Sequence, residues 1–370
     1  MGTPASPRLL SLDVLRGATI AAMILVNNPG SWSHVYPPLR HAEWHGCTPT
    51  DLVFPFFLFM VGVSIALALG GRVDRGDPRG AIVLKILRRG LLLYLFGLLL
   101  AGFPTFPWER IRVLGVLPRI ALCYVGASLL FLFTSARVQV RVAVGCLLAY
   151  WPLMTLIPVP GIGAPDLSET GANLAAWIDR TLFGRHLWRG GDYDPEGLVS
   201  TIPALATTLI GVSAGRSLRG DSPREEQVLQ LLLRGCTLVL LGSVWGWFFP
   251  INKALWTSSF ALYTGGLALC ALGLCVWAFD VRQHPRIARP FTVYGVNALA
   301  VFVGSGLLAR TLGSLWKLED GRSVQRWFYQ EALASWLDPL HASLVYALIW
   351  VAGWYGILEV LWRRRIVLKV

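Results

Sequence analysis

Apolar runs of about twenty residues recur along this chain, from near its first residue to near its last. A run of that length crosses the roughly 30 Å hydrocarbon core of a bilayer as a helix. Of the 370 residues, 55% are hydrophobic and only 15% are charged, which is too apolar for one soluble core. The pattern therefore predicts an all-α, polytopic membrane protein with a single transmembrane domain over residues 1–370.

The apolar runs predict about ten spanning helices, with boundaries good to a few residues. Five of the six cysteines fall inside these runs and only Cys47 lies in a loop, which argues against a disulfide framework or a metal cluster. No metal cofactor is expected. The predicted spans are 12–30, 50–70, 82–102, 111–133, 138–159, 198–217, 228–249, 256–279, 288–310 and 339–362.

Basic residues predict the orientation of these spans, because Lys and Arg are retained on the cytoplasmic side. With the N-terminus inside, about two thirds of the 33 lysines and arginines fall on the inner side. Both termini are therefore expected in the cytoplasm, and no cleavable signal is apparent. The net charge of +12 then belongs to the cytoplasmic face and does not indicate a nucleic-acid partner.

The stretch "HAEWHGCTPTDLVFPFFLFMVG" places titratable groups directly before the second span, on the predicted outer side. Thr48, Pro49 and Asp51 form a helix-start signal, so Asp51 has a structural reading as a cap. His41 precedes the helix and no capping geometry requires it. Asp51 is therefore open to both a structural and a functional reading, and His41 is a candidate site residue.

Other segments bring polar groups to the same outer level. The first span ends in "LVNNPG", which carries Asn27, and the sixth begins in "YDPEGLVSTIP", which carries Glu196. Burying such groups without partners is costly, so they are expected to meet one another or a ligand. The segment before the eighth span, "FFPINKALWTSSF", adds Asn252, Lys253, Trp256 and Ser258.

Four of the polar residues inside predicted spans stand out. Arg119 in "GVLPRIALCY" is the most unusual, since arginine at membrane depth normally faces a cavity or a carboxylate. Asp13 and Arg16 lie three residues apart on the first helix and either pair with each other or serve a site. Asn297 in "YGVNALAVF" is read either as a contact between helices or as a site residue.

Together these stretches resemble the heparan-α-glucosaminide N-acetyltransferase family, including its bacterial NagX-like members. The resemblance rests on "RLLSLDVLRG", "LVNNPG", "HAEWHGCTPTDLVFPFFLFMVGVS", "RIALCY", "DPEGLVSTIPA" and "INKALWTSSF", in this order over nearly the whole chain. It implies a multi-pass acyltransferase that takes acetyl groups from cytoplasmic acetyl-CoA and delivers them to a glucosamine-type amine on the outer side.

The resemblance also assigns residues. It implies that His41 is the active histidine and that Asn27 is the matching asparagine, with Asp13, Arg119 and Glu196 on functionally sensitive positions. It further implies a homodimer in a lipid bilayer. No large outer domain precedes the first span, which favours a bacterial inner-membrane form and leaves the acceptor open to sugars other than heparan.

The chemistry of the residues is compatible with that reading. An amine acceptor needs a base near neutral pH, and His41 can remove its proton or carry the acetyl group itself. Asn27 can supply a donor to the oxyanion. The imidazole and the donor thioester are then expected to meet in one cavity. Arg72, Arg216 and Arg282 are candidates for the CoA phosphates, but topology already explains each of them.

A second function is compatible with the same residues. Polar groups beside proline-containing spans, such as those with Pro55 and Pro203, are also typical of secondary transporters. The alternative hypothesis is therefore a carrier for amino sugars such as N-acetylglucosamine. Uptake that needs no acetyl donor distinguishes it from the acetyltransferase.

Overall fold

The computed structural model describes residues 9–368, which are helical apart from loops and two isolated bridges. The predicted domain 1–370 also includes residues 1–8 and 369–370, which lie outside the described residues. The helices are α1 Leu10–Asn27, α2 Val53–Asp74, α3 Arg79–Gly102, α4 Val116–Phe133, α5 Ala136–Thr155, α6 Leu174–Phe183, α7 Thr201–Arg219, α8 Arg224–Trp245, α9 Ser258–Cys275, α10 Pro285–Val296, α11 Ala298–Arg310, α12 Val324–Trp327 and α13 Pro339–Arg363.

The all-helical membrane fold is confirmed. Within residues 9–368, eight helices are long and apolar enough to cross a membrane. Two further predicted spans, 82–102 and 198–217, are also long helices, α3 and α7. Basic side chains in the first half of α3, and serines and threonines along α7, reduce their hydropathy. The protein is a multi-pass membrane protein.

The predicted ninth span, 288–310, is wrong. The chain breaks at Asn297, whose backbone (φ −113°, ψ 32°) ends α10, and α11 begins at the next residue. α10 carries Arg286, Arg289 and Pro290, so it is too polar and too short to cross a bilayer. The apolar segment that is long enough runs instead from α11 through a π-helical turn, over Ala298–Leu315.

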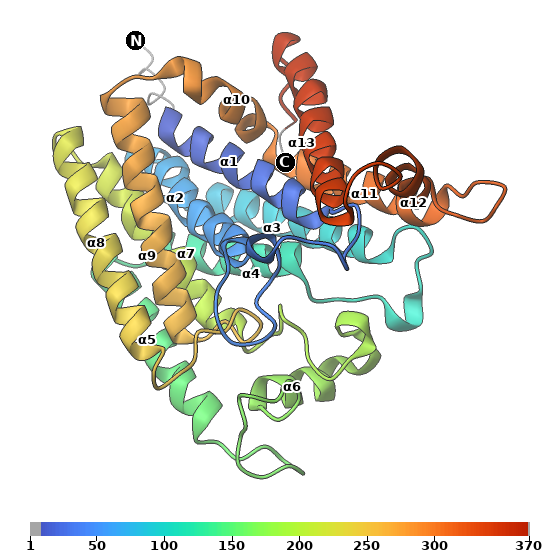
Figure 1. Cartoon of the computed structure of the whole chain (residues 1–370). Coiled ribbons are helices and arrows are strands. Elements are labelled where there is room, and N and C mark those ends of the chain that lie inside the picture. Colours follow the sequence, from blue (N-terminus) through green and yellow to red (C-terminus); the bar gives the residue numbers. More distant parts are fainter. Residues whose placement is uncertain (1–8, 369–370) are drawn as a thin grey trace.

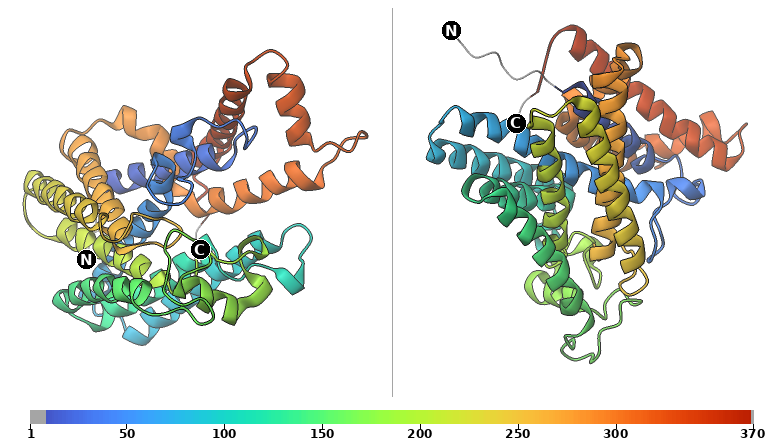
Figure 2. Two further views of the ribbon diagram at one scale, coloured as in Figure 1. Left: turned by 60° about the horizontal axis from the view of Figure 1, so that its bottom comes forward. Right: turned by 90° about the vertical axis from the view of Figure 1, so that its left-hand side faces the viewer.

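Close helix contacts depend on glycine at the centre of the bundle. A Cβ added at Gly62 of α2 would lie 1.9 Å from the carbonyl oxygen of Thr208, and one at Gly211 of α7 would lie 2.0 Å from that of Phe59. No side chain fits in such gaps, and small residues are how membrane helices approach closely. α8 and α9 run side by side at one edge of the bundle (Figure 2).

The bundle has two chemically different ends. The loops 28–52, 156–200 and 246–257 lie at one end with α6, which we call the loop end (Figure 1). The first turn of α1, the last turn of α13 and α10 lie at the other, which we call the basic end (Figure 1). The orientation predicted above places the basic end in the cytoplasm.

Candidate active site

His41, Asp51 and Lys253 meet at the loop end. Oδ1 of Asp51 lies 2.6 Å from Nδ1 of His41, and Nζ of Lys253 lies 3.0 Å from the same ring nitrogen. Nζ of Lys253 is also 3.3 Å from Oδ1 of Asp51. The structure thus brings together candidates from two loops that lie far apart in the sequence.

Local structure explains why Asp51 is held in place. It lies in a 3₁₀ turn, Pro49–Leu52, that leads into α2, and its Oδ2 accepts hydrogen bonds of 3.0 Å from the Thr48 amide and from the Thr48 hydroxyl. The Ala42 amide donates a third, also at 3.0 Å. The side chain is 1% exposed. The capping reading of Asp51 is confirmed, and its other oxygen contacts His41, so the functional reading stays a prediction.

This contact leaves Nε2 as the available nitrogen of His41. When Nδ1 donates its proton to Asp51, Nε2 keeps a lone pair, because the bond made by one ring nitrogen sets the tautomer of the other. Lys253 can only donate, so it then bonds to Asp51 and not to the ring. The His41 side chain is 47% exposed. The arrangement can therefore act as a base or as a nucleophile.

Asn252 serves mainly to shape the loop that carries Lys253. It is buried, and its Oδ1 accepts a 2.9 Å hydrogen bond from the Leu255 amide. Its amide nitrogen lies 3.3 Å from Nδ1 of His45. The Gly46 amide donates to the Ile251 carbonyl at 2.7 Å, which joins the two loops. These contacts hold the loop in the position that places Lys253 beside Asp51.

Trp256 and Ser258 lie deeper in the bundle. Trp256 is fully buried, with a left-handed backbone (φ 49°), and the Arg119 guanidinium lies 5.2 Å from the centre of its ring. Ser258 donates a 2.7 Å hydrogen bond to the Leu147 carbonyl and so ties α9 to α5. The Trp256 amide donates to the Lys253 carbonyl at 3.1 Å, but in the described chain neither the Trp256 nor the Ser258 side chain bonds to the side chains of His41, Asp51 or Lys253.

Arg119 is buried, as expected of an intramembrane arginine near a partner. Its Nη2 donates to the Gly197 carbonyl at 3.0 Å and to the Ser200 hydroxyl. Within residues 9–368, Nε and Nη1 have no hydrogen-bond partner. Glu196 lies close enough to attract the guanidinium but is not bonded to it.

The partner of Glu196 is Arg112, a residue that sequence reasoning missed. Arg112 donates to Glu196 and, through Nε at 2.8 Å, to the fully buried carboxylate of Asp194. Burial favours the neutral form of Glu196, but the Arg112 guanidinium holds its pKa below the ordinary value. The predicted fourth span began at residue 111, whereas α4 begins at Val116. No pattern in the sequence around Arg112 indicates this pairing, because the pairing joins segments more than eighty residues apart.

Asp179 in α6, at the loop end, makes the stability of the folded protein depend on pH. Burial, with a smaller contribution from Asp194, raises its pKa from 3.8 to about 6, although it accepts a 3.0 Å bond from the Leu198 amide. The folded protein then binds more protons than the unfolded chain between about pH 4 and 6, so stability falls as pH rises through this window. The fall is on the order of 2–3 kcal/mol.

We expect Asp179→Asn, which keeps the acceptor for Leu198, to remove that dependence. Thermal unfolding in detergent between pH 4 and 7 measures it. Asp192→Asn, at an exposed acid of the same outer segment, is the matched control. An unchanged pH slope in Asp179→Asn would show that another group is responsible.

In the described chain, no hydrogen bond or ion pair joins three further candidates to His41, Asp51 or Lys253. Asp13 pairs with Arg16 at 3.0 Å, as the simpler reading of their spacing predicted. Asn27 ends α1 with an exposed side chain, and no hydrogen bond joins it to His41 in the described chain. Asn297 lies at the basic end, where its side chain binds the backbone of Ile366 and Leu368 at 3.2 and 2.8 Å.

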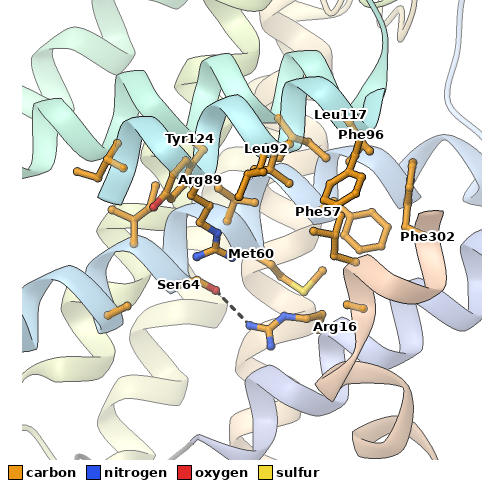
Figure 3. Close-up of a pocket in the computed structure, with 18 of the residues that line it drawn as sticks. Arg16, Phe57, Met60, Ser64, Arg89, Leu92, Phe96, Leu117, Tyr124 and Phe302 are labelled. Carbon is orange, nitrogen blue, oxygen red and sulfur yellow. Dashed lines mark hydrogen bonds between the residues drawn. The ribbon is translucent and has the colours of Figure 1, made fainter. Parts of the chain in front are cut away.

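A cavity of about 870 Å³ opens within the bundle (Figure 3). This volume falls in the range of about 300–1,000 Å³ that is usual for small-molecule sites. Most of its lining is apolar and comes from α2, α3, α4 and α11. Figure 3 shows Phe57, Met60, Leu92, Phe96, Leu117 and Phe302 on these walls.

Five cations also line the cavity. Arg16 and Arg72 are paired with Asp13 and Asp77, at 3.0 and 2.9 Å. The other three come from the first half of α3, and within residues 9–368 none of them has an acidic partner. Sequence reasoning counted them only as evidence of orientation. The three are Lys85, Arg88 and Arg89.

The cavity does not reach His41, although the sequence predicted one shared cavity. Neither His41 nor Asp51 lines it, and its lining on α2 toward the loop end stops at Phe57. Phe57 lies six residues beyond Asp51, which is about 9 Å along a helix. Aromatic side chains at Phe57, Phe96 and Phe302 lie close together at one end of the lining (Figure 3).

Comparisons with known proteins place the chain in one family. The family model described as "Heparan-alpha-glucosaminide N-acetyltransferase, catalytic" matches residues 8–244. The human heparan-alpha-glucosaminide N-acetyltransferase is 29% identical over 395 residues, which cover 92% of this chain and 59% of the human protein. The mouse protein of that name is 28% identical over 394 residues, with the same shares. This chain thus spans less than two thirds of the length of these relatives. It belongs to the heparan-alpha-glucosaminide N-acetyltransferase catalytic family.

Proposed function

We propose that this protein moves the acetyl group of acetyl-CoA, bound from the basic end, to the amine of a glucosamine-type sugar at the loop end. The observation that carries the proposal is the 2.6 Å contact between His41 and the buried Asp51. It supplies an oriented imidazole of the kind that acyl transfer to an amine requires. Membership of the family supports the same reaction class.

In the direct route, Nε2 of His41 takes a proton from the sugar amine while the amine nitrogen attacks the thioester carbonyl. The new C–N bond forms, the C–S bond breaks, and CoA leaves as the thiol after accepting a proton. In the alternative route, Nε2 attacks the thioester carbonyl, the C–S bond breaks and CoA leaves as the thiolate, which gives an acetyl-histidine. The sugar amine then attacks that acetyl group, the bond from the carbonyl carbon to Nε2 breaks, and the proton lost by the amine ends on the CoA thiolate. We favour the direct route, with Asn27 as donor to the oxyanion and Asp51 and Lys253 orienting the ring.

The cavity at the basic end fits the donor. Lys85, Arg88 and Arg89 have no acidic partner in the described chain and suit the phosphates of CoA. The apolar walls suit its pantetheine arm. The cavity does not include His41, so the proposal requires side chains at the end of the cavity nearest to Asp51, such as Phe57, to move and let the acetyl group pass.

The sugar is expected to bind in the outer loops. Trp44 donates to the Leu167 carbonyl at 2.7 Å and meets Tyr193 edge-on at 5.4 Å between ring centres. Such rings can stack on a sugar face. Arg119 and Glu196 hold the end of the loop 156–200 in place, through their contacts with Gly197 and Arg112. The proposal further places the protein in the bacterial inner membrane as a homodimer, with both termini in the cytoplasm.

The test is donor turnover by the purified protein. We expect acetyl-CoA to release free CoA thiol when glucosamine or a glucosaminide is added, with stoichiometric N-acetylation of the sugar. The same protein without an acceptor serves as the control. In proteoliposomes, transfer from acetyl-CoA outside to sugar trapped inside would require a route across the bilayer. A broad acceptor panel with no turnover and no donor binding would overturn the proposal.

Uptake measurements in the same vesicles distinguish the acetyltransferase from the alternative hypothesis, a transporter. A transporter for amino sugars would accumulate labelled N-acetylglucosamine without any acetyl donor. Uptake of that kind, with no release of CoA under the same conditions, would replace the transferase by a carrier.

A further inference from the structure

A second hollow, of about 460 Å³, opens at the basic end beside the large cavity. It lies where α10, the last turn of α13 and the segment after α13 come together. None of the proposed catalytic residues touches it. Its wall includes Arg289, Val296, Trp362, Arg363, Arg365 and Ile366.

Positive charge exceeds negative charge in this hollow. Arg289 and Arg363 both donate to one oxygen of Glu359, at 2.6 and 2.9 Å. Arg365 adds a third guanidinium, and it has no acidic partner among residues 9–368. Three guanidinium groups thus lie in the wall of the hollow, and one carboxylate pairs with two of them, which leaves the hollow attractive to an anion.

Apolar side chains surround the same cations. Trp362 and Val367 are 39% and 41% exposed, and Val360, two residues before Trp362 on α13, is 51% exposed. On α10, Ile287 is 61% exposed. Exposed apolar groups beside arginines, with a tryptophan at a helix end, are typical of the boundary between hydrocarbon and headgroups.

The segment after α13 forms part of the wall of the hollow. Arg365 has a left-handed backbone (φ 57°), so the chain turns back after α13, and the Ile366 amide bonds to the Leu361 carbonyl at 2.9 Å (Figure 1). Asn297 then holds Ile366 and Leu368. Ile366 and Val367 line the hollow and Leu368 lines the large cavity, so the returning segment forms a partition between the two spaces.

We propose that the hollow binds the phosphate of an anionic phospholipid from the adjoining leaflet, with acyl chains against the exposed apolar side chains. Basic pockets between membrane helices bind such headgroups. The phosphates of CoA share this chemistry, but the exposed apolar rim suits a lipid and the partition separates the hollow from the large cavity. The inference does not depend on the transferase activity.

Binding is measured by native mass spectrometry and thermal shift of the full chain in detergent, titrated with short-chain phosphatidylglycerol or phosphatidylcholine. We expect preferential binding of phosphatidylglycerol that weakens with salt. Arg365→Gln should lower its apparent affinity about fivefold, and Arg365→Lys should restore most of it. Since Arg365 has no acidic partner in the described chain, neither variant should unfold the protein. Arg137→Gln, an exposed arginine of α5 at the same end, is the matched control.

Three outcomes would overturn the inference. Equal binding of the two lipids would remove the role of charge, and an unchanged affinity in Arg365→Gln would place the lipid elsewhere. Displacement of phosphatidylglycerol by 3′,5′-ADP, with loss of nucleotide binding in Arg365→Gln, would assign the hollow to CoA instead. Because these measurements need no substrate turnover, they stand apart from the acetyltransferase test.

Discussion

Replacing His41 by alanine is expected to reduce acetyl transfer by at least about 10²–10⁴-fold, the usual contribution of a positioned base. The imidazole is half-exposed and holds no helix in place, so the protein should keep its thermal stability. Its loss should therefore appear in kcat, with donor binding little changed. The measurement is release of CoA thiol with a glucosamine acceptor, together with acetyl-CoA binding to the same sample.

Asp51→Asn tests whether the contact between Asp51 and His41 is needed for acetyl transfer. An asparagine can still accept hydrogen bonds from Thr48 and Ala42, so the turn before α2 is retained. Its amide nitrogen would face Nδ1 of His41 as a donor, which forces the proton onto Nε2 and removes the reactive lone pair. We expect a loss of kcat approaching that of His41→Ala, with a folded protein.

His34→Ala is the matched control for both variants. His34 lies in the same outer loop and is exposed, and within residues 9–368 its ring hydrogen-bonds only to the hydroxyls of Ser31 and Ser33, at 3.4 and 3.3 Å. Its activity should equal that of the wild type. Full activity in His41→Ala would end the catalytic assignment, whereas equal losses in all three variants would indicate damage to the loop.

Helix positions could be predicted because the length of an apolar run is a local property of the sequence. Where a local break intervenes, as at Asn297, a continuous run of hydrophobic residues was read as one span although α10 is amphipathic. Contacts of the outer loops were less predictable. His41 and Asp51 lie ten residues apart, but Lys253 reaches them only through a fold that brings residues 41–51 and 253 together.

Charged residues show more clearly what could not be predicted from the sequence. The basic residues at Lys85, Arg88 and Arg89 were fully explained by topology, and nothing in their spacing indicates that α2, α4 and α11 leave a cavity beside them. Arg112 was placed inside a span because its neighbours are apolar. Its pairing with Asp194 and Glu196 joins segments more than eighty residues apart, which no local pattern encodes.

Replacing a cation of α3 is expected to have a second large effect, on the KM for acetyl-CoA. If CoA binds in the cavity, Arg88→Glu should raise the KM for acetyl-CoA by about tenfold or more, because a charge-assisted bond to phosphate is lost and a repulsion is introduced. kcat at saturating donor should change little, since Arg88 is remote from His41. Arg141→Glu, an exposed arginine at the start of α5 outside the cavity, makes the same charge change at the same end.

The two charge variants separate a bound phosphate from a general field. A field acts on any anion that approaches the basic end, so both variants would then raise KM alike, and added salt would abolish the difference from wild type. A phosphate held in the cavity responds to Arg88 alone. Acetyl-dephospho-CoA sharpens the comparison: if Arg88 contacts the 3′-phosphate, wild type and Arg88→Glu should differ much less with this donor. A KM unchanged in Arg88→Glu would exclude its guanidinium from donor binding.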